Sequence, residues 1–296
     1  MLSYEHCRLC PRACGVDRRK GQIGFCGMTD TLKVARASLH FGEEPVISGH
    51  FGAGTVFFSG CNLRCGYCQN WRLSHEGLGA EVTSGQLRTL FLRLIDEGAE
   101  NIELVTPTQF LPTILPALQP KLPVPVVYNC GGYESVEVLR QLEGMIDVYL
   151  PDLKYSDKAL ARALSQAEDY PEVAQNVILE MYRQVGKPQY RDGILTKGVL
   201  VRHLVLPGNV GNSLGVLDWL SERFPKGEVL LSLMRQYTPM GRLKDVPPYD
   251  RAVTEEEYAA VRSWAELCGI KEGFFQEEAA VGQAYVPEFT ENFAEL

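Results

Sequence analysis

The sequence predicts an α/β fold: a partial (β/α)6 barrel of six strands alternating with helices, preceded by a small cysteine-rich module that a metal staples. Three observations support this prediction. From residue 55 onward, short apolar runs alternate with helical patterns. Polar residues or cysteines follow each apolar run, and seven of the nine cysteines lie near the N-terminus. Alternating strands and helices indicate a parallel sheet with helices outside it. A doubly wound sheet remains an alternative, because periodicity does not decide whether the sheet closes into a barrel.

The predicted strands are apolar runs that end near glycine, proline or polar residues, at 55–60, 101–105, 124–129, 146–154, 199–207 and 229–234. A weakly alternating run at 32–40 predicts a strand that bridges to the main body. Helices are expected at 83–98, 134–142, 156–183, 212–223 and 254–268. The first of these helices has the clearest signals, since Thr83 and Ser84 can cap it and Gly98 ends it.

Composition limits the function classes. The chain has 296 residues, of which 45% are apolar and 22% charged, which is enough to bury a full core. Its net charge of −8 argues against binding to nucleic acid or to an anionic membrane. It shows no signal-like leader and no apolar run of about 20 residues. We therefore expect a cytoplasmic protein, whose clustered cysteines bind metal rather than form disulfides.

Two regions are expected. Residues 1–45 form a cysteine-rich N-terminal module, whose first 30 residues have too few large apolar side chains to fold without a metal. Residues 46–296 form the partial barrel with a C-terminal helical extension.

The stretch FFSGCNLRCGYCQNW, residues 57–71, contains Cys61, Cys65 and Cys68 directly after the first barrel strand. Three thiolates are one ligand short of a closed tetrahedral metal site. A four-iron, four-sulfur cluster held by three thiolates keeps one iron open for a substrate or cofactor. The alternatives are a zinc site that His75 completes, or three buried cysteines.

The spacing Cys-x3-Cys-x-aromatic-Cys, with Tyr67 before Cys68, resembles the signature of the radical S-adenosylmethionine (SAM) superfamily. The resemblance implies that SAM binds the open iron of a [4Fe–4S] cluster. It implies further that one electron cleaves SAM, and that the 5′-deoxyadenosyl radical removes a hydrogen atom from a substrate. The cofactor supplies this chemistry, while the protein positions it and excludes water.

Three further segments extend the resemblance. GCNLRCGYCQN, YLPDLKY (149–155) and VRHLVLPG (201–208) are similar to segments of the pyruvate formate-lyase activating enzymes, which act on glycyl radical enzymes. With its early cysteines and its late SLMRQYTP, the whole chain looks most like the PflX-type group. This resemblance implies an electron donor such as flavodoxin or ferredoxin, and a protein or peptide substrate. One departure is Thr106-Pro107-Thr108-Gln109, where the activating enzymes have a Gly-Gly-Glu type segment.

The C-terminal ends of parallel strands meet at one edge, so the polar residues there are the candidates for cofactor contacts. They are Tyr67, Asn70, Thr106, Thr108, Asn129, Asp152, Lys154, Arg202, His203 and Gln236. Asp152 and Lys154 are two apart and share one face of an extended strand. Lys154 would meet the SAM carboxylate and Asp152 a hydroxyl, while a mutual salt bridge is the structural alternative. His203 is at least as well explained by a structural role.

Cys7, Cys10, Cys14 and Cys26 form a second group, which supplies four thiolates and so a closed metal site. The site could hold an auxiliary Fe–S cluster that relays an electron or a zinc ion that folds the module, because both accept four thiolates.

Two function classes remain. The first is a radical SAM enzyme that activates a protein by abstracting hydrogen from glycine, or that modifies a small molecule or peptide. The second is a non-catalytic Fe–S or zinc protein that transfers electrons. Polar residues at every strand end favour the enzyme, because an electron carrier needs no such residues.

Overall fold

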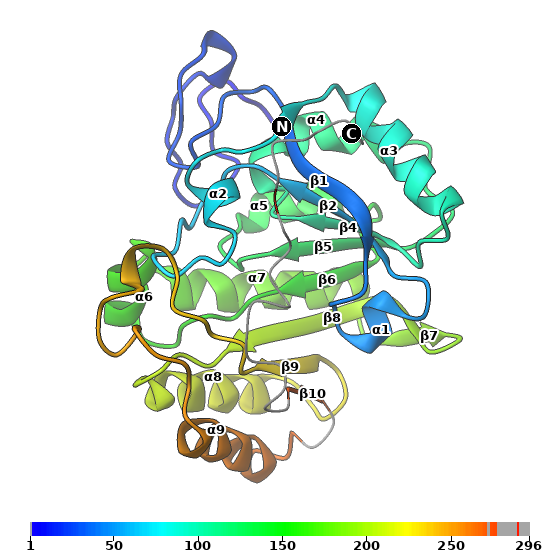
Figure 1. The fold of residues 1–296 in the computed structure, drawn as a ribbon. Coiled ribbons are helices and arrows are strands. Elements are labelled where there is room, and N and C mark those ends of the chain that lie inside the picture. Colours follow the sequence, from blue (N-terminus) through cyan, green and yellow to red (C-terminus); the bar gives the residue numbers. More distant parts are fainter. Residues whose placement is uncertain (1, 271–272, 277–288, 290–296) are drawn as a thin grey trace.

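The computed structural model describes residues 2–270, 273–276 and 289. Figure 1 shows a central sheet, with the cysteine-rich N-terminal segment beside one end of it and helices packed around it. Within the described residues, ten strands form one mixed sheet in the order β10-β9-β8-β6-β5-β4-β2-β1-β3, with β7 paired to β8. The chain is therefore α/β, as predicted.

The six predicted barrel strands are confirmed. They form a continuous parallel ladder in sequence order: β2 (Ala53–Phe58), β4 (Ile102–Val105), β5 (Val126–Cys130), β6 (Val148–Pro151), β8 (Ile194–Leu204) and β9 (Leu230–Met234). This order never reverses, whereas a doubly wound sheet requires a reversal. Because β–α–β crossovers are right-handed, a strand order without a reversal places the connecting helices on one face of the sheet.

The sheet is open at both edges. The predicted bridging strand is β1 (Lys33–His40), which runs antiparallel to β2. Beyond it lies the short β3 (Ala80–Glu81), and β10 (Phe274–Phe275) forms the other edge parallel to β9. A hairpin strand, β7 (Gln189–Arg191), pairs with the start of β8. Within the described residues the two edges do not pair, so the sheet does not close into a barrel.

Helices fill the connections between the parallel strands. The longer ones are α3 (Ser84–Asp96), α4 (Leu111–Ala117), α6 (Lys158–Ser165), α7 (Tyr170–Val185), α8 (Val210–Arg223) and α9 (Glu255–Leu267). Shorter turns are α1 (Pro45–Ser48), α2 (Trp71–Ser74), α5 (Val136–Leu139), η1 (Arg18–Lys20), η2 (Thr108–Phe110), η3 (Arg140–Leu142) and η4 (Gly241–Leu243). As expected, Thr83 caps α3 and forms a capping box with Gln86.

The helix predicted at 156–183 is wrong as a single element, because the chain forms α6 and α7 with a turn between them. Gln166 caps α6 in the left-handed conformation, at φ +52°, and α7 begins with Pro171 in its first turn. Proline is favoured at a helix start and disfavoured inside one. The predicted C-terminal helical extension is α9, and most of the chain after Ile270 lies outside the described residues.

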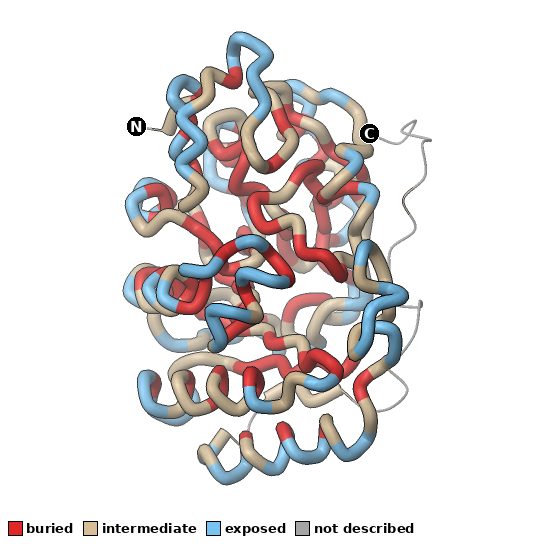
Figure 2. Tube along the Cα trace, turned by 90° about the vertical axis from the view of Figure 1, so that its left-hand side faces the viewer, coloured by how far each residue is buried: buried red, intermediate tan, exposed pale blue. Residues whose placement is uncertain are grey.

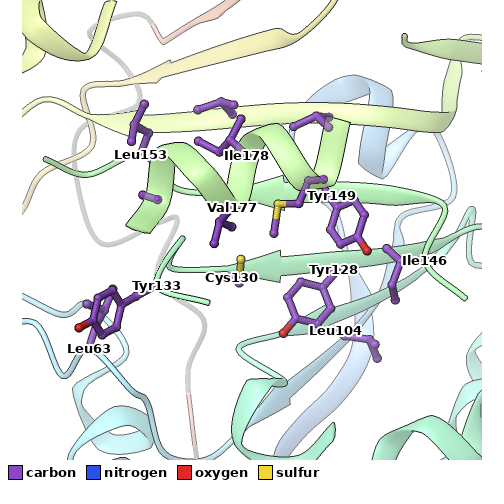
Figure 3. Packing of buried hydrophobic residues seen from close by; sticks show 14 of the residues in the cluster. Leu63, Leu104, Tyr128, Cys130, Tyr133, Ile146, Tyr149, Leu153, Val177 and Ile178 are labelled. Carbon is purple, nitrogen blue, oxygen red and sulfur yellow. The ribbon is translucent and has the colours of Figure 1, made fainter. Parts of the chain in front are cut away.

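Side chains alternate between the two faces of the parallel strands. Tyr128 and Cys130 of β5 point toward α7, where Val177 and Ile178 complete the core (Figure 3). Val127, the residue before Tyr128, belongs to a separate apolar cluster on the inner face, which includes Ile47 of α1. Strands buried on both faces are typical of parallel sheets, and their sequences are nearly continuous apolar runs.

In Figure 2 the buried residues lie along the centre of the molecule, and exposed residues mark the outer helix turns and much of the N-terminal segment. Among the described residues there is no helix whose length and apolarity would let it cross a membrane.

Candidate functional site

The cysteine loop, residues 60–70, follows β2 at the C-terminal edge of the parallel strands. Gly60 opens it with φ +79°, a conformation that side chains rarely adopt. A Cβ there would clash with Met28 Cγ and would lie 2.7 Å from the Cys26 carbonyl oxygen. The Cys61 amide donates to the same carbonyl at 3.3 Å. Glycine therefore lets the loop pack against the N-terminal segment.

Cys65 is buried, Cys61 and Cys68 are partly buried, and the three thiols lie close enough to influence one another. Burial, together with the Cys65 and Cys68 thiols, raises the pKa of Cys61 to about 12. Burial and the Cys65 thiol likewise raise the pKa of Cys68 to about 11. Thiolates so placed need a compensating positive centre, because a metal binds only the deprotonated form. All nine cysteines are free thiols, so no disulfide competes for them.

Neither cysteine group is arranged around a single metal position. Within the part of the chain that the structure describes, no three Cys, His, Asp or Glu side chains converge on one metal position. A zinc ion at either group would require its sulfurs to move to about 2.3 Å from the ion. In a four-iron cluster each thiolate binds a different iron, so the sulfurs need not converge on one point.

His75 does not complete a zinc site with the cysteine loop. Its Nδ1 lies 2.8 Å from Ser74 Oγ, and its Nε2 lies 3.2 Å from the Arg64 carbonyl oxygen. The ring stacks on Trp71 with 3.6 Å between the centroids. Both ring nitrogens thus have partners other than a cysteine, which disfavours the zinc alternative.

The cysteine loop lines a cavity of about 180 Å³, here called the smaller chamber. The predicted cofactor-binding residues that line it are Tyr67, Asn70, Thr106, Asn129, Asp152, Lys154, Arg202 and Gln236. They come from the ends of five parallel strands and from the loop itself, so the topology brings them together as expected. Cys130 also borders this chamber, but its side chain points toward α7 (Figure 3).

Two predicted residues lie away from the smaller chamber. His203 is fully buried, with Nδ1 2.6 Å from the Leu153 carbonyl oxygen and Nε2 2.8 Å from Ser213 Oγ. It joins β8 to α8, which is the structural role. Thr108 is buried too, and its hydroxyl donates to Glu134 at 2.8 Å.

A charged network crosses the chamber wall. Lys154 Nζ lies 2.5 Å from Asp152 Oδ2, and Arg202 Nε lies 3.6 Å from Asp152 Oδ1. Arg202 also donates to Asn129 Oδ1 at 2.8 Å and to Glu43 Oε2 at 2.7 Å. This network fixes the positions of the Lys154 ammonium and the Arg202 guanidinium, which line the same chamber as the cysteine loop.

A chain of hydroxyl groups ends on one of the three cysteines. Ser165 Oγ donates to Cys65 Sγ at 3.0 Å, and Tyr155 OH lies 2.7 Å from that Ser165 oxygen. Tyr67 OH lies 2.9 Å from Tyr155 OH. Ser165 belongs to α6 and Tyr155 to the segment between β6 and α6, and the sequence pattern did not reveal this hydrogen-bonded chain.

The four N-terminal cysteines gather at one small cavity of about 20 Å³, next to Asn62 of the cysteine loop and Gln109 of η2. Cys10 is partly buried there, and this burial raises its pKa to about 12. Gln109 Nε2 donates to the carbonyl oxygens of Ser59 and Gly60, at 2.8 and 3.2 Å. The two cysteine groups are thus tied together through η2.

Two arginines that the sequence did not single out hold this segment. Arg18 is fully buried and donates to the Gln109 carbonyl at 2.6 Å and the Met28 carbonyl at 3.1 Å. Arg12 stacks over Phe25 at 3.8 Å and donates to the Asn62 carbonyl at 2.8 Å. Both arginines lie within residues 10–18, CPRACGVDR. Their contacts attach this segment to the rest of the protein, which explains them better than a need for positive charge.

A larger chamber of about 560 Å³ adjoins the smaller one. Both are lined by Gln69, Asn70, Val105, Asn129, Arg202, Met234 and Gln236. Glu43 and Glu44 also line the larger chamber, and Glu103 lies behind Asn129, whose Nδ2 donates to its Oε1 at 2.6 Å. The sequence pattern did not point to these acids. A glutamate inside the apolar run 101–105 was the available signal for Glu103.

Comparisons with known proteins give limited further information. No family model matches this chain. An uncharacterized protein of Methanocaldococcus jannaschii, MJ0674, is 28% identical over 276 residues, which cover 89% of this chain and 75% of that protein. The crystal structure of Streptococcus suis SuiB superposes with a TM-score of 0.47 at 14% identity, over 81% of this chain. The match spans 53% of the SuiB chain, about half its length, and supports no functional statement at this score.

Proposed function

We propose that this protein is a radical SAM enzyme whose Cys61, Cys65 and Cys68 hold a [4Fe–4S] cluster with one iron open to SAM. The observation that carries the proposal is the position of this three-thiol loop. It lines a chamber at the C-terminal edge of six parallel strands, together with the polar residues of those strands. On this proposal the open sheet is a partial barrel, residues 46–296 form the catalytic region, and residues 1–45 form the attached module.

When bound, the cluster and SAM would supply a 5′-deoxyadenosyl radical that abstracts hydrogen. The chain's own residues bind and orient SAM. Lys154, held by Asp152, offers an ammonium to the carboxylate of SAM. Asn70, Thr106 and Gln236 line the same wall and offer hydrogen bonds to its polar groups.

The wall of the smaller chamber also excludes water. Water there would allow side reactions of a carbon radical and would weaken every charged contact. Leu63 is 1% exposed and Tyr237 is 2% exposed, and both line the chamber with Leu204 and Met234. The same wall carries polar and charged side chains from the loop and the strand ends, so the chamber offers apolar surface together with hydrogen-bonding groups.

The N-terminal cysteines form part of the same proposal. We infer that Cys7, Cys10, Cys14 and Cys26 bind a second centre, either zinc or an Fe–S cluster, because all four line one cavity. An Fe–S centre there would accept electrons from a donor such as flavodoxin or ferredoxin. Free thiols and such clusters suit a reducing compartment, so we propose a cytoplasmic location.

The resemblance to activating enzymes motivates a protein or peptide as the target, and a small molecule is the alternative. A non-catalytic electron carrier is disfavoured by one observation. The larger chamber opens directly beside the cysteine loop's chamber, and a carrier that only transfers electrons has no use for that space.

The test is anaerobic reconstitution with iron and sulfide, followed by dithionite and SAM. We expect 5′-deoxyadenosine from the wild-type protein and none from the C61A/C65A/C68A variant. Cys268→Ala is the matched control, because Cys268 lies outside both cysteine groups, and it should retain the activity. Cleavage of SAM by the triple variant would contradict the proposal, as would a fully reconstituted wild-type protein that leaves SAM intact.

A further inference from the structure

The larger chamber lies where a substrate would meet the proposed radical, so its lining reports on substrate chemistry. It shares Asn70, Asn129, Arg202 and Gln236 with the smaller chamber. Its volume of about 560 Å³ is within the range for small-molecule sites and is sufficient for one side chain of a peptide. The inference below rests on the proposed function in placing the reacting group there.

Among the residues of this wall that the structure describes, carboxylates outnumber cationic side chains. Glu43 is paired with Arg202 at 2.7 Å, and that guanidinium is already engaged with Asn129 and near Asp152. Glu44 Oε2 is buried and, within the described residues, accepts no hydrogen bond. His40 adds no reliable positive charge, because burial and nearby arginines lower its pKa.

An unpaired buried carboxylate oxygen is costly, and a protein keeps one mainly where a ligand completes it. Burial raises the pKa of Glu44, and the Arg202 guanidinium only partly offsets this effect. A ligand that brings its own positive charge would restore the ionised form and supply the missing donor. A ligand carboxylate would instead meet Glu43 and Glu44 and be repelled.

The same chamber has an aromatic side. Phe57, Phe274 and Phe275 line it, and Phe41 lies at its rim with 63% of its surface exposed. Aromatic faces bury an apolar stem and attract a cation at its end. The exposed ring of Phe41 is accessible to the apolar stem of a ligand in the chamber.

We propose that the larger chamber binds a cationic group, an ammonium or guanidinium, carried on an apolar stem, with Glu44 as its carboxylate partner and Phe41 beside the stem. This group belongs either to a small amine or to a lysine or arginine side chain of a peptide.

The proposal is tested by binding, with no need for SAM cleavage. The dissociation constants of n-pentylamine, 1-pentanol and pentanoate are measured by NMR titration on the reconstituted full-length protein. We expect the protonated amine to bind at least about 10-fold more tightly than the alcohol, and pentanoate to bind worst. Equal affinities, or preference for pentanoate, would overturn the proposal. N-acetyl-lysine N-methylamide, compared with n-pentylamine, distinguishes a peptide source from a free amine.

Variants assign the preference to residues. Glu44→Gln keeps the shape of the side chain and should abolish the roughly 10-fold preference for the amine while leaving pentanol binding unchanged. The control is Glu222→Gln, because Glu222 is an exposed glutamate of α8 outside both chambers. This variant should keep the preference for the amine. Phe41→Ala should weaken amine and alcohol alike. If Glu44→Gln retains the preference, the proposal is wrong. An amine preference without SAM cleavage contradicts only the proposed function, and cleavage without the preference contradicts only this inference.

Discussion

Lys154 Nζ lies 2.5 Å from Asp152 Oδ2 in the wall of the chamber that the three-cysteine loop lines, and each side chain is only 17% exposed. Burial lowers the pKa of Lys154, but the charge of Asp152 and the nearby cysteines outweigh burial, so that its pKa is raised. The ammonium therefore stays charged at neutral pH. Only one of its three N–H donors is needed for Asp152, which leaves donors for a carboxylate.

Lys154→Ala should weaken SAM binding and leave the cluster intact. The loss of a hydrogen bond to a charged group costs about 1.5–3 kcal/mol, or roughly 10- to 150-fold in dissociation constant. Calorimetry on the anaerobic, reconstituted protein measures it, and the visible spectrum checks the cluster. Lys158→Ala is the control, because Lys158 is exposed and pairs with Glu172 at 2.5 Å outside the chamber. Unchanged affinity in Lys154→Ala would leave the pair a purely structural salt bridge.

Ser165→Ala should lower the reduction potential of the proposed cluster, because Ser165 donates to Cys65 Sγ. The donor stabilises the reduced, more negative cluster more than the oxidised one. A difference of about 1 kcal/mol between the two states corresponds to roughly 40 mV for one electron. Redox titration followed by electron paramagnetic resonance measures the shift. Ser221→Ala, on α8, should not move the potential, and an equal potential in Ser165→Ala would refute the assignment.

The N-terminal cysteines should retain metal when the active loop has lost its own. In the C61A/C65A/C68A protein, metal analysis and Mössbauer spectra should detect one zinc ion or one residual iron centre. Replacing Cys10 and Cys26 by Ser as well should remove it and lower the unfolding temperature by several degrees, since the metal supplies part of the folding free energy. If the triple variant contains neither zinc nor iron, the second centre does not exist.

Glu103 should make stability fall with pH. Burial is the main cause that raises its pKa to about 8, against an ordinary value of 4.5. Between these values the folded protein holds a proton that the unfolded chain has released. The contribution of Glu103 to the free energy of unfolding is therefore complete below about pH 4.5 and is lost as pH rises toward 8. The free energy of unfolding falls over this range by up to about 1.4 kcal/mol per pH unit.

Glu103→Gln keeps the shape of the side chain and one oxygen that can accept from Asn129, its NH2 would face a Thr55 hydroxyl that can accept instead, and it cannot titrate. Urea unfolding from pH 5 to 8 should thus show a shallower decline in the free energy of unfolding for the variant than for the wild-type protein. Glu137→Gln, an exposed substitution, should match the wild type. Parallel pH profiles for Glu103→Gln and the wild type would show that Glu103 is ionised in the fold.

The strands were predictable because buried parallel strands are short apolar runs, and their sequence order fixed which strand ends would meet. That is why Asn129, Asp152 and Arg202, far apart in sequence, were correctly expected on one edge. His203 shows the limit: two neighbours on a strand face opposite sides, and the sequence did not decide which side Arg202 and which side His203 would face.

Other features depend on contacts between distant segments. Ser165 lies 100 residues from Cys65, and nothing local to either residue announces their hydrogen bond. Glu43 reaches Arg202 because β1 runs antiparallel to β2 and returns the chain beneath the chamber. The turn at Gln166 interrupts a continuous helical pattern, which periodicity alone does not reveal.

The central claim is that SAM binds an iron held by Cys61, Cys65 and Cys68. Electron–nuclear double resonance tests it most directly, on the reduced, reconstituted protein with SAM labelled with ¹⁵N at the amino group and ¹³C at the carboxylate. The account predicts hyperfine coupling between the cluster and both labelled groups, present in the wild-type protein and absent from the C61A/C65A/C68A variant. A reduced wild-type cluster that shows no coupling to bound, labelled SAM would contradict it.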